Sequence, residues 1–120
     1  MTLRQPQRRG ERVAPPAAAE DWELRFATGE AADGWEELCA NAPGPTKACW
    51  EQLRRDPRRH DQRQKRLWDK LAERVIGGQS FEQWQFEVTG GGRVWYCPDD
   101  GRRIVWLVLA RTGHPPTTGA

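Results

Sequence analysis

The stretch WQFEVTGGGRVWYCPDDGRRIVWLVLA, residues 84–110, decides the fold. Its first segment, residues 84–88, alternates apolar and polar side chains, which is the pattern of a strand with one buried face. Residues 93–97 alternate in the same way after a run of glycines. Residues 104–110 are apolar without alternation, which predicts a central strand that is covered on both faces. Because short turns join these segments, we expect an antiparallel meander.

The segments before this stretch predict a strand followed by two helices. Residues 22–26 alternate like a half-buried strand. Asp33 and Glu36 resemble a capping box, and the apolar spacing after them predicts an amphipathic helix. A second helix is expected to begin near Thr46 and to end before Pro57. Two short helices in succession predict an αα-hairpin.

The region between the helices and the meander is less regular. Residues 67–71 fit either a short helix or an extended segment. Residues 74–76 before Gly77-Gly78 predict a strand that enters a two-residue hairpin turn. Pro98 predicts an early turn or a lost ladder hydrogen bond at its strand end. The expected architecture is therefore α+β in a single small domain, with an N-terminal strand, an αα-hairpin and a curved antiparallel β-meander.

Length and composition limit the class of protein. The chain has 120 residues, enough for one compact domain. It contains no apolar run of membrane-spanning length and no secretory signal, so we expect a soluble, cytoplasmic protein. Its three cysteines and two histidines lack metal-ligand spacing, so we expect neither a metal nor another cofactor. Residues 1–19 are rich in arginine and proline and predict a disordered arm, with the domain covering residues 20–118.

Charge is unevenly distributed although the net charge is only +2. Residues 20–37 contain seven acidic residues and one arginine, whereas residues 54–66 contain seven basic residues and two aspartates. Clustered guanidinium groups bind phosphate and release counterions, so this basic block is a candidate surface for RNA; the alternative is a solvated loop. The candidate RNA contacts in the block are Arg58, Arg59, Arg63, Lys65 and Arg66.

Candidate catalytic residues converge on one edge of the predicted meander. Arg93 opens a strand whose outward face also carries Trp95, and an arginine beside an aromatic ring suits RNA because it pairs a phosphate contact with base stacking. Arg111 and His114 follow the last strand, which brings them to the edge where Arg93 begins its strand. His114 is the candidate general acid or base because its ordinary pKa lies near neutrality. The other tryptophans are expected to lie mostly in the core.

These residues resemble a known family. The stretch from Trp84 to Tyr96, with its Gly-x-Arg-x-x-Tyr pattern, followed by the apolar strand and Thr112-Gly113-His114-Pro115, is similar to toxins of the RelE/ParE superfamily of type II toxin–antitoxin systems. The helical hairpin and the basic segment fit the same order of elements, so the resemblance extends over residues 22–117.

The resemblance implies a small cytoplasmic toxin that binds a cognate antitoxin, as a toxin–antitoxin hetero-oligomer. RelE-like members cleave messenger RNA in the ribosomal decoding site without a metal. By position, Arg93 matches the arginine that stabilises the scissile phosphate, and Arg111 and His114 match further basic or acid–base residues. RelE-like toxins often end in a segment with a catalytic tyrosine, but residues 115–120 contain none, so the acid role falls to His114.

Two other functions fit the same sequence. A ParE-like inhibitor of DNA gyrase blocks a protein machine and needs no catalytic acid or base. A non-catalytic adaptor, or inactivated toxin, would bind nucleic acid or protein through its basic surface without cleaving RNA.

Overall fold

The computed structural model describes residues 9–13 and 21–113. The elements in chain order are β1 (Glu23–Phe26), α1 (Gly29–Asn41), α2 (Pro43–Arg55), β2 (Gln64–Arg66), a short 3₁₀ helix η1 (Asp69–Leu71), β3 (Glu73–Ile76), β4 (Gln79–Glu82), β5 (Trp84–Glu87), β6 (Arg93–Asp99) and β7 (Ile104–Arg111). None of the helices in the described residues is long and apolar enough to cross a membrane.

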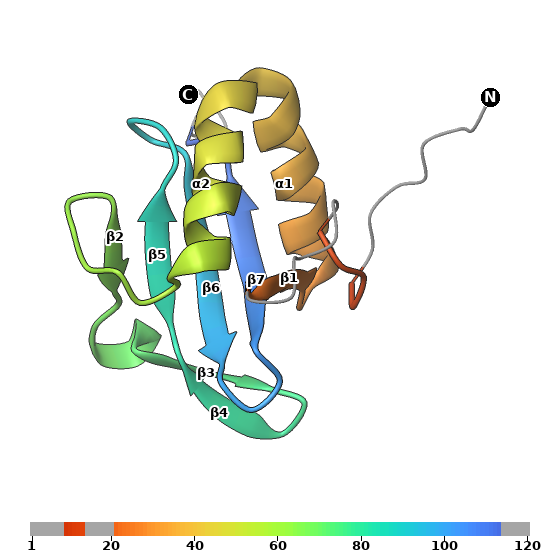
Figure 1. Ribbon diagram of the computed structural model, residues 1–120, viewed down its shortest axis with the longest axis vertical. Helices are drawn as coiled ribbons and strands as arrows, with labels where there is room; N and C mark the ends of the chain where they lie inside the picture. The colour runs from red at the N-terminus through yellow and green to blue at the C-terminus, as the bar shows by residue number, and fades with distance from the viewer. Residues whose placement is uncertain (1–8, 14–20, 114–120) are drawn as a thin grey trace.

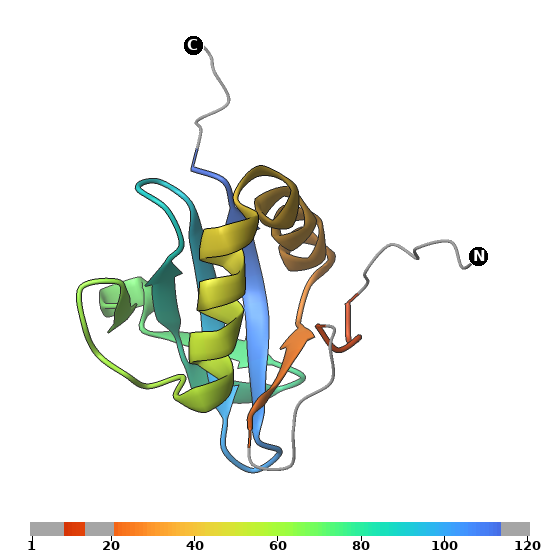
Figure 2. The same cartoon turned by 45° about the horizontal axis from the view of Figure 1, so that its top comes forward.

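Five strands form one sheet in the order β1-β7-β6-β5-β2, and β3 and β4 form a separate hairpin. β1 runs parallel to β7, whereas the other strand pairs are antiparallel. Both helices lie on the same side of the sheet (Figures 1 and 2). The predicted α+β order of a strand, two helices and an antiparallel meander is confirmed.

Both helices begin earlier than the sequence pattern predicted. α1 begins at Gly29 because the hydroxyl of Thr28 accepts a hydrogen bond from a backbone N–H of the first turn and caps the helix. Asp33 therefore lies inside α1, and its prediction as the cap is wrong. α2 begins at Pro43 rather than near Thr46, since proline is well tolerated in a first turn, where its missing N–H has no helical partner.

The helices cover the inner face of the sheet and close the main core. That core contains Leu24 and Phe26 of β1, Leu38 of α1 and Leu53 of α2, all at most 2% exposed. α1 approaches β7 closely at Gly34, where a Cβ atom would overlap the carbonyl of Ala110. The acidic helix is thereby held directly against the end of the central strand.

The β3–β4 hairpin covers part of the opposite, outer face. Phe81, Cys97 and Val108 form a second buried cluster there, and Ile76 and Trp106 pack against it. β7 is therefore covered on both faces, as its continuous apolar sequence predicted. The predicted Gly77-Gly78 turn is also confirmed, since it joins β3 to β4 and both glycines have positive φ.

Three further segments differ from expectation. β6 continues through Pro98, which pairs with Val105 of β7, so the prediction of an early turn is wrong. On the other side, β5 pairs with β6 only as far as Tyr96, so Pro98 has a neighbouring strand of the sheet on one side only. Residues 67–71 are neither a helix nor an extended segment over their whole length, because an extended start leads into the 3₁₀ helix η1. The polar strand β2 was not expected and forms an edge of the sheet.

Residues 9–13 change the expectation of a disordered arm at this segment. Arg12 forms an antiparallel bridge with Arg25 of β1. The N–H groups of Gly10 and Val13 donate to carbonyls of β1, and Val13 is 2% exposed. This part of the arm thus covers the outer edge of β1, while residues 1–8 and 14–20 lie outside the described residues.

Candidate functional site

The sheet brings Arg93 and Arg111 directly opposite each other. Arg93 is the first residue of β6 and Arg111 the last residue of β7, and the two are partners in the antiparallel register. Directly paired residues of adjacent strands project from the same face, so both arginines leave the outer face of the sheet together. We call them the arginine pair. The predicted convergence of these two cations is confirmed by the register.

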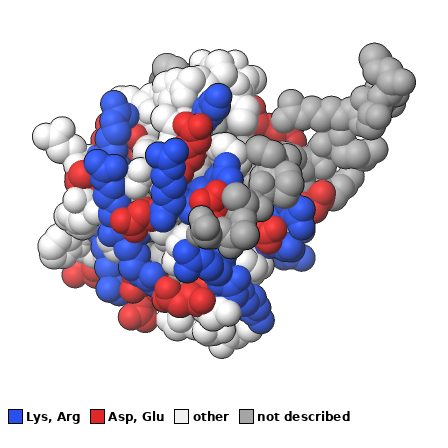
Figure 3. All heavy atoms as spheres, viewed as in Figure 1, with Lys and Arg blue, Asp and Glu red and all other residues white. Residues whose placement is uncertain are grey.

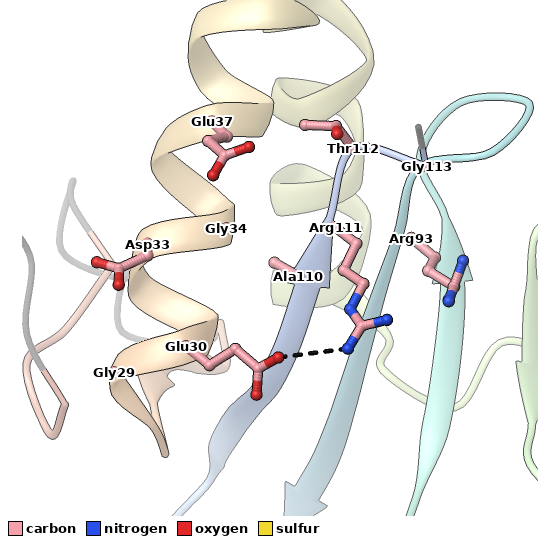
Figure 4. Close-up of a pocket in the computed structure, with 10 residues that line it drawn as sticks. All are labelled: Gly29, Glu30, Asp33, Gly34, Glu37, Arg93, Ala110, Arg111, Thr112 and Gly113. Atoms are coloured by element: carbon pink, nitrogen blue, oxygen red, sulfur yellow. Dashed lines mark hydrogen bonds and ion pairs between the residues drawn. The ribbon is translucent and has the colours of Figure 1, made fainter. Parts of the chain in front are cut away.

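A cavity of about 1150 Å³ lies between α1 and the arginine pair. Its lining residues are Gly29, Glu30, Asp33, Gly34 and Glu37 of α1, Arg93 of β6, and Ala110, Arg111, Thr112 and Gly113 at the end of β7. One wall is thus acidic and the other basic. Figure 4 shows Arg111 between Glu30 and Arg93, with Asp33 turned away from the arginines.

Glu30 is a carboxylate that sequence reasoning missed. Its Oε2 lies 3.5 Å from Nη2 of Arg111, although the two residues are 81 positions apart in the chain. The contact exists because β1 pairs with β7 only up to Leu107, so the end of β7 has no strand between it and α1. Both side chains are more than half exposed, so the pair can exchange with a ligand at small cost in free energy.

Glycines shape the base of this cavity. Gly113 has a φ of +93°, and a Cβ atom there would overlap the backbone of Gly91. Gly92 also leaves no room for a side chain, since Thr89 and the backbone of Arg111 and Thr112 surround it. The glycine run between β5 and β6 and the glycine after β7 therefore pack backbone against backbone. This contact fixes the start of β6 relative to the end of β7, and so the arginine pair.

His114 lies outside the described residues. The structure follows the chain to Gly113, the residue before it, at the rim of the cavity. The predicted role of His114 as acid or base therefore stays a prediction.

Arg58 of the basic block is engaged by carboxylates. Its Nε donates to Glu82 at 2.7 Å, and its two terminal nitrogens donate to Asp100 at 2.9 and 2.8 Å. Hydrogen bonds from Arg58 lower the pKa of Asp100, and although burial raises the pKa of Glu82, hydrogen bonds from Trp84 and Arg58 outweigh it and leave that pKa below its ordinary value. Arg58 ties the loop after α2 to β4 and to the β6–β7 turn, which accounts for it structurally.

The other basic candidates differ in how far they are engaged. Arg59 pairs with Asp61 at 3.1 Å, and Arg63 donates to the carbonyls of Glu87 and Val88 at the end of β5. Arg66 lies 3.8 Å from Glu82, and Lys65 is exposed on β2. Lys65 and Arg66 are therefore the members of the set most available to an anion.

Trp95 is held in place rather than free to stack. Its indole N–H donates to Gln85 at 2.9 Å, and the ring is partly buried against the second cluster on the outer face. Part of the ring is used for packing, so any stacking on Trp95 is confined to the part left open.

A buried polar cluster connects the sheet to the basic loop. The hydroxyl of Tyr96 donates to the carbonyl of Pro57 at 2.8 Å and accepts from Nε2 of Gln64 at 2.9 Å. Both side chains are fully buried, and burial raises the pKa of Tyr96 far above its ordinary value. The hydroxyl of Tyr96 is buried and used in both hydrogen bonds, so Tyr96 anchors the loop and is out of reach of a substrate.

Charges of both signs are interspersed over the face that carries α2 (Figure 3). In the described residues no group of three or more His, Cys, Asp or Glu side chains could hold a metal ion. Burial raises the pKa of Cys97 to about 12 and that of Cys49 further, so both thiols remain protonated. Comparisons with protein families, with curated proteins and with solved structures found no match to this chain.

Proposed function

We propose that the protein is the toxin of a type II toxin–antitoxin pair, a metal-independent endoribonuclease that cleaves messenger RNA on the ribosome. The observation that carries the proposal is the arginine pair, in which two arginines extend from directly paired positions of β6 and β7 and line one cavity. Like charges are held together at some cost in free energy, and a phosphate that binds both relieves this repulsion.

RNA cleavage of this kind needs a base, an acid and positive charge. The base takes the proton of the 2′-hydroxyl, the 2′-oxygen attacks phosphorus, and the P–O5′ bond breaks as the acid protonates the 5′-oxygen. The products are a 2′,3′-cyclic phosphate and a 5′-hydroxyl. Arg93 and Arg111 stabilise the charge that develops on the phosphorane, which is the largest contribution expected of such a site.

The proton-transfer roles go to Glu30 and His114. Glu30 is the base, because its carboxylate lines the cavity and already contacts Arg111. His114 is the acid. On ligand binding the phosphate takes the place of Glu30 on Arg111, which frees the carboxylate to accept a proton.

Fewer residues of the basic block are expected to contact RNA outside the cavity than its sequence suggests. Lys65 and Arg66 on the edge strand are the members we retain. In the described residues Lys65 has no ion pair and Arg66 makes only one at 3.8 Å, whereas Arg58 and Arg59 are paired with carboxylates at 2.7 to 3.1 Å. The proposed protein partner is a cognate antitoxin, which would have to cover the arginine pair to silence the enzyme.

The experiment is induced expression of the wild-type chain and of Arg93→Ala, with growth and messenger RNA 5′ ends followed in the same cultures. We expect growth arrest and new in-frame cuts with the wild type, and neither with Arg93→Ala at equal protein level. Arrest without new cuts would contradict the ribonuclease.

A second candidate is a toxin or adaptor that binds without catalysis, with a ParE-like gyrase inhibitor as its toxin form. It is favoured by the Glu30–Arg111 ion pair, which gives the cavity one acidic and one basic wall, as suits a partner with charges of both signs. Arrest with inhibited DNA supercoiling in place of RNA cuts indicates the gyrase inhibitor. The absence of growth arrest, together with salt-sensitive binding of nucleic acid or protein, indicates the adaptor.

A further inference from the structure

Trp68 is the exposed tryptophan of this protein. It is 78% exposed, whereas the other tryptophans are buried or half-buried. It lies between the edge strand β2 and η1, at the side of the sheet where β2 is drawn in Figure 1. Its ring is therefore open to a ligand, which the buried indole rings are not.

The exposure of Trp68 is built into a fixed backbone. The carbonyl of Trp68 accepts from the N–H of Leu71 at 2.9 Å, and the preceding N–H, of Leu67, donates to Gln83 at 2.9 Å. The side-chain amide of Gln83, itself buried, donates to the carbonyl of Leu71 at 2.8 Å. The next residue, Asp69, has a φ of +53°, a left-handed conformation that aspartate adopts more readily than most residues and that suits this turn.

Basic residues flank Trp68 in the chain. Lys65, Arg66 and Lys70 lie within three residues of it, and all are exposed. Asp69 is the acidic residue of the same short segment, so positive charge prevails. Among the described residues, no ion pair joins Lys65 or Lys70 to a carboxylate, and Arg66 makes a long one, at 3.8 Å.

We propose that Trp68 is a stacking platform for a base of single-stranded RNA, with Lys65 and Arg66 holding the adjacent phosphates. This inference rests on the proposed function and adds a second binding position to it. An exposed aromatic face with exposed cations close to it in the chain is the combination that single-stranded nucleic acid binds, because the ring takes a base and the cations take the backbone.

The sheet connects this position to the arginine pair. Arg93 is opposite Glu87 on β5, and Gln83, four residues earlier on that segment, accepts the N–H of Leu67. The two positions are thus separated by about 13 Å along the strands and about 10 Å across two strand spacings. Lys65 lies between them, since it is paired with Gln85, which is paired in turn with Trp95 on the outer face. Lys65 thus shares the outer face with the arginine pair, and a single strand of several nucleotides is long enough to reach from that pair to Trp68.

Binding is tested with a short fluorescein-labelled oligouridylate that carries 2′-O-methyl riboses and so cannot be cleaved by 2′-oxygen attack. Fluorescence anisotropy is measured with the full-length wild-type chain, Trp68→Leu and Trp68→Tyr. We expect about tenfold weaker binding for Trp68→Leu and near wild-type binding for Trp68→Tyr, because the ring and not its apolar area is what stacks. Unchanged affinity in Trp68→Leu would overturn the proposal.

Matched controls separate the alternatives. Lys65→Ala should reduce the salt dependence of binding, whereas Lys47→Ala, which removes an exposed lysine from α2, should not. Val75→Ala removes another exposed apolar side chain and should leave RNA binding intact. If Trp68→Leu instead changes only self-association in sedimentation, Trp68 serves a protein interface and the proposal fails. Because the probe is not cleavable, these results stand apart from any failure of the proposed nuclease activity.

Discussion

At the scale of single residues, Arg93 and Arg111 are not equivalent. Arg111 shares its charge with Glu30, while in the described residues Arg93 has no ion pair. A phosphate in the cavity therefore takes its first full cation from Arg93. We expect Arg93→Ala to reduce the rate of RNA cleavage about 100-fold or more, and Arg111→Ala to reduce it less. Single-turnover cleavage on programmed ribosomes measures both, and equal rates for Arg93→Ala and the wild type would exclude Arg93 from the site.

Glu30 has either a catalytic role or a role as counter-ion, and one substitution distinguishes them. If Glu30 is the base, Glu30→Gln should slow cleavage at least about 100-fold, because the amide cannot take the proton of the 2′-hydroxyl. If Glu30 only neutralises Arg111, Glu30→Gln should leave the cleavage rate unchanged or raise it. Asp33→Asn is the matched control, since Asp33 lines the cavity but points away from the arginines (Figure 4).

Tyr96 is predicted to act through stability alone. Tyr96→Phe leaves the carbonyl of Pro57 and the amide of Gln64 without their buried partner, so we expect a loss of about 1–3 kcal/mol in the free energy of unfolding. Denaturant titration measures the loss. The double variant Tyr96→Phe/Gln64→Leu should lose less than the sum of the two single changes, because the two side chains contact each other. Strict additivity would contradict a coupled cluster.

At the scale of elements, the alternation of apolar and polar residues predicted strands. It did not predict which distant residues would contact each other. Residues 84–88 and 93–97 have the period of a half-buried strand, and the structure has strands there. β2 escaped prediction because its residues, Gln64 to Arg66, are polar and its pairing with β5 spans about twenty residues. The cap of α1 was misplaced because Asp33 and Thr28 are both good capping residues, and the start at Thr28 prevails where its hydroxyl also donates to Val108 of β7.

In the candidate site, too, one part could be predicted from the sequence and another could not. The register of β6 and β7, and so the arginine pair, follows from a tight turn between two strands. Glu30 could not be found in this way, because its contact depends on where β1 ends and on how closely α1 approaches β7.

The close approach of α1 to β7 depends on Gly34. Gly34→Ala places a methyl group on the carbonyl of Ala110, so α1 must move away from the strand. We expect a loss of at least about 2 kcal/mol in the free energy of unfolding, measured by thermal or denaturant unfolding. Gly44→Ala is the control, since nothing lies near a Cβ atom at that position of α2. A Gly34→Ala protein as stable as the control would contradict this packing.

At the scale of the whole molecule, Arg58 makes stability depend on pH. It pairs with Glu82 and Asp100, whose pKa values in the folded protein are both lowered. A carboxyl with a lowered folded pKa stabilises the protein above its ordinary pKa, and this contribution is lost as the pH falls through the folded pKa. Stability should therefore decline below about pH 4.5.

Removing the cation should weaken that dependence. Arg58→Met should unfold more readily at neutral pH and show a flatter decline in acid, when unfolding is followed from pH 7 to about pH 3. Arg55→Met, at an exposed position near the end of α2, is the control and should follow the wild type. An Arg58→Met curve parallel to that of the wild type would show that these carboxylates titrate independently of Arg58.

The most direct test of the central claim is the chemistry of the RNA ends. Purified protein is incubated with ribosomes programmed with a defined messenger RNA, and the ends of the products are determined. Attack by the 2′-oxygen beside the arginine pair predicts a 2′,3′-cyclic phosphate and a 5′-hydroxyl, with the cut absent in Arg93→Ala. Intact messenger RNA, or products with 5′-phosphate and 3′-hydroxyl ends, would contradict it.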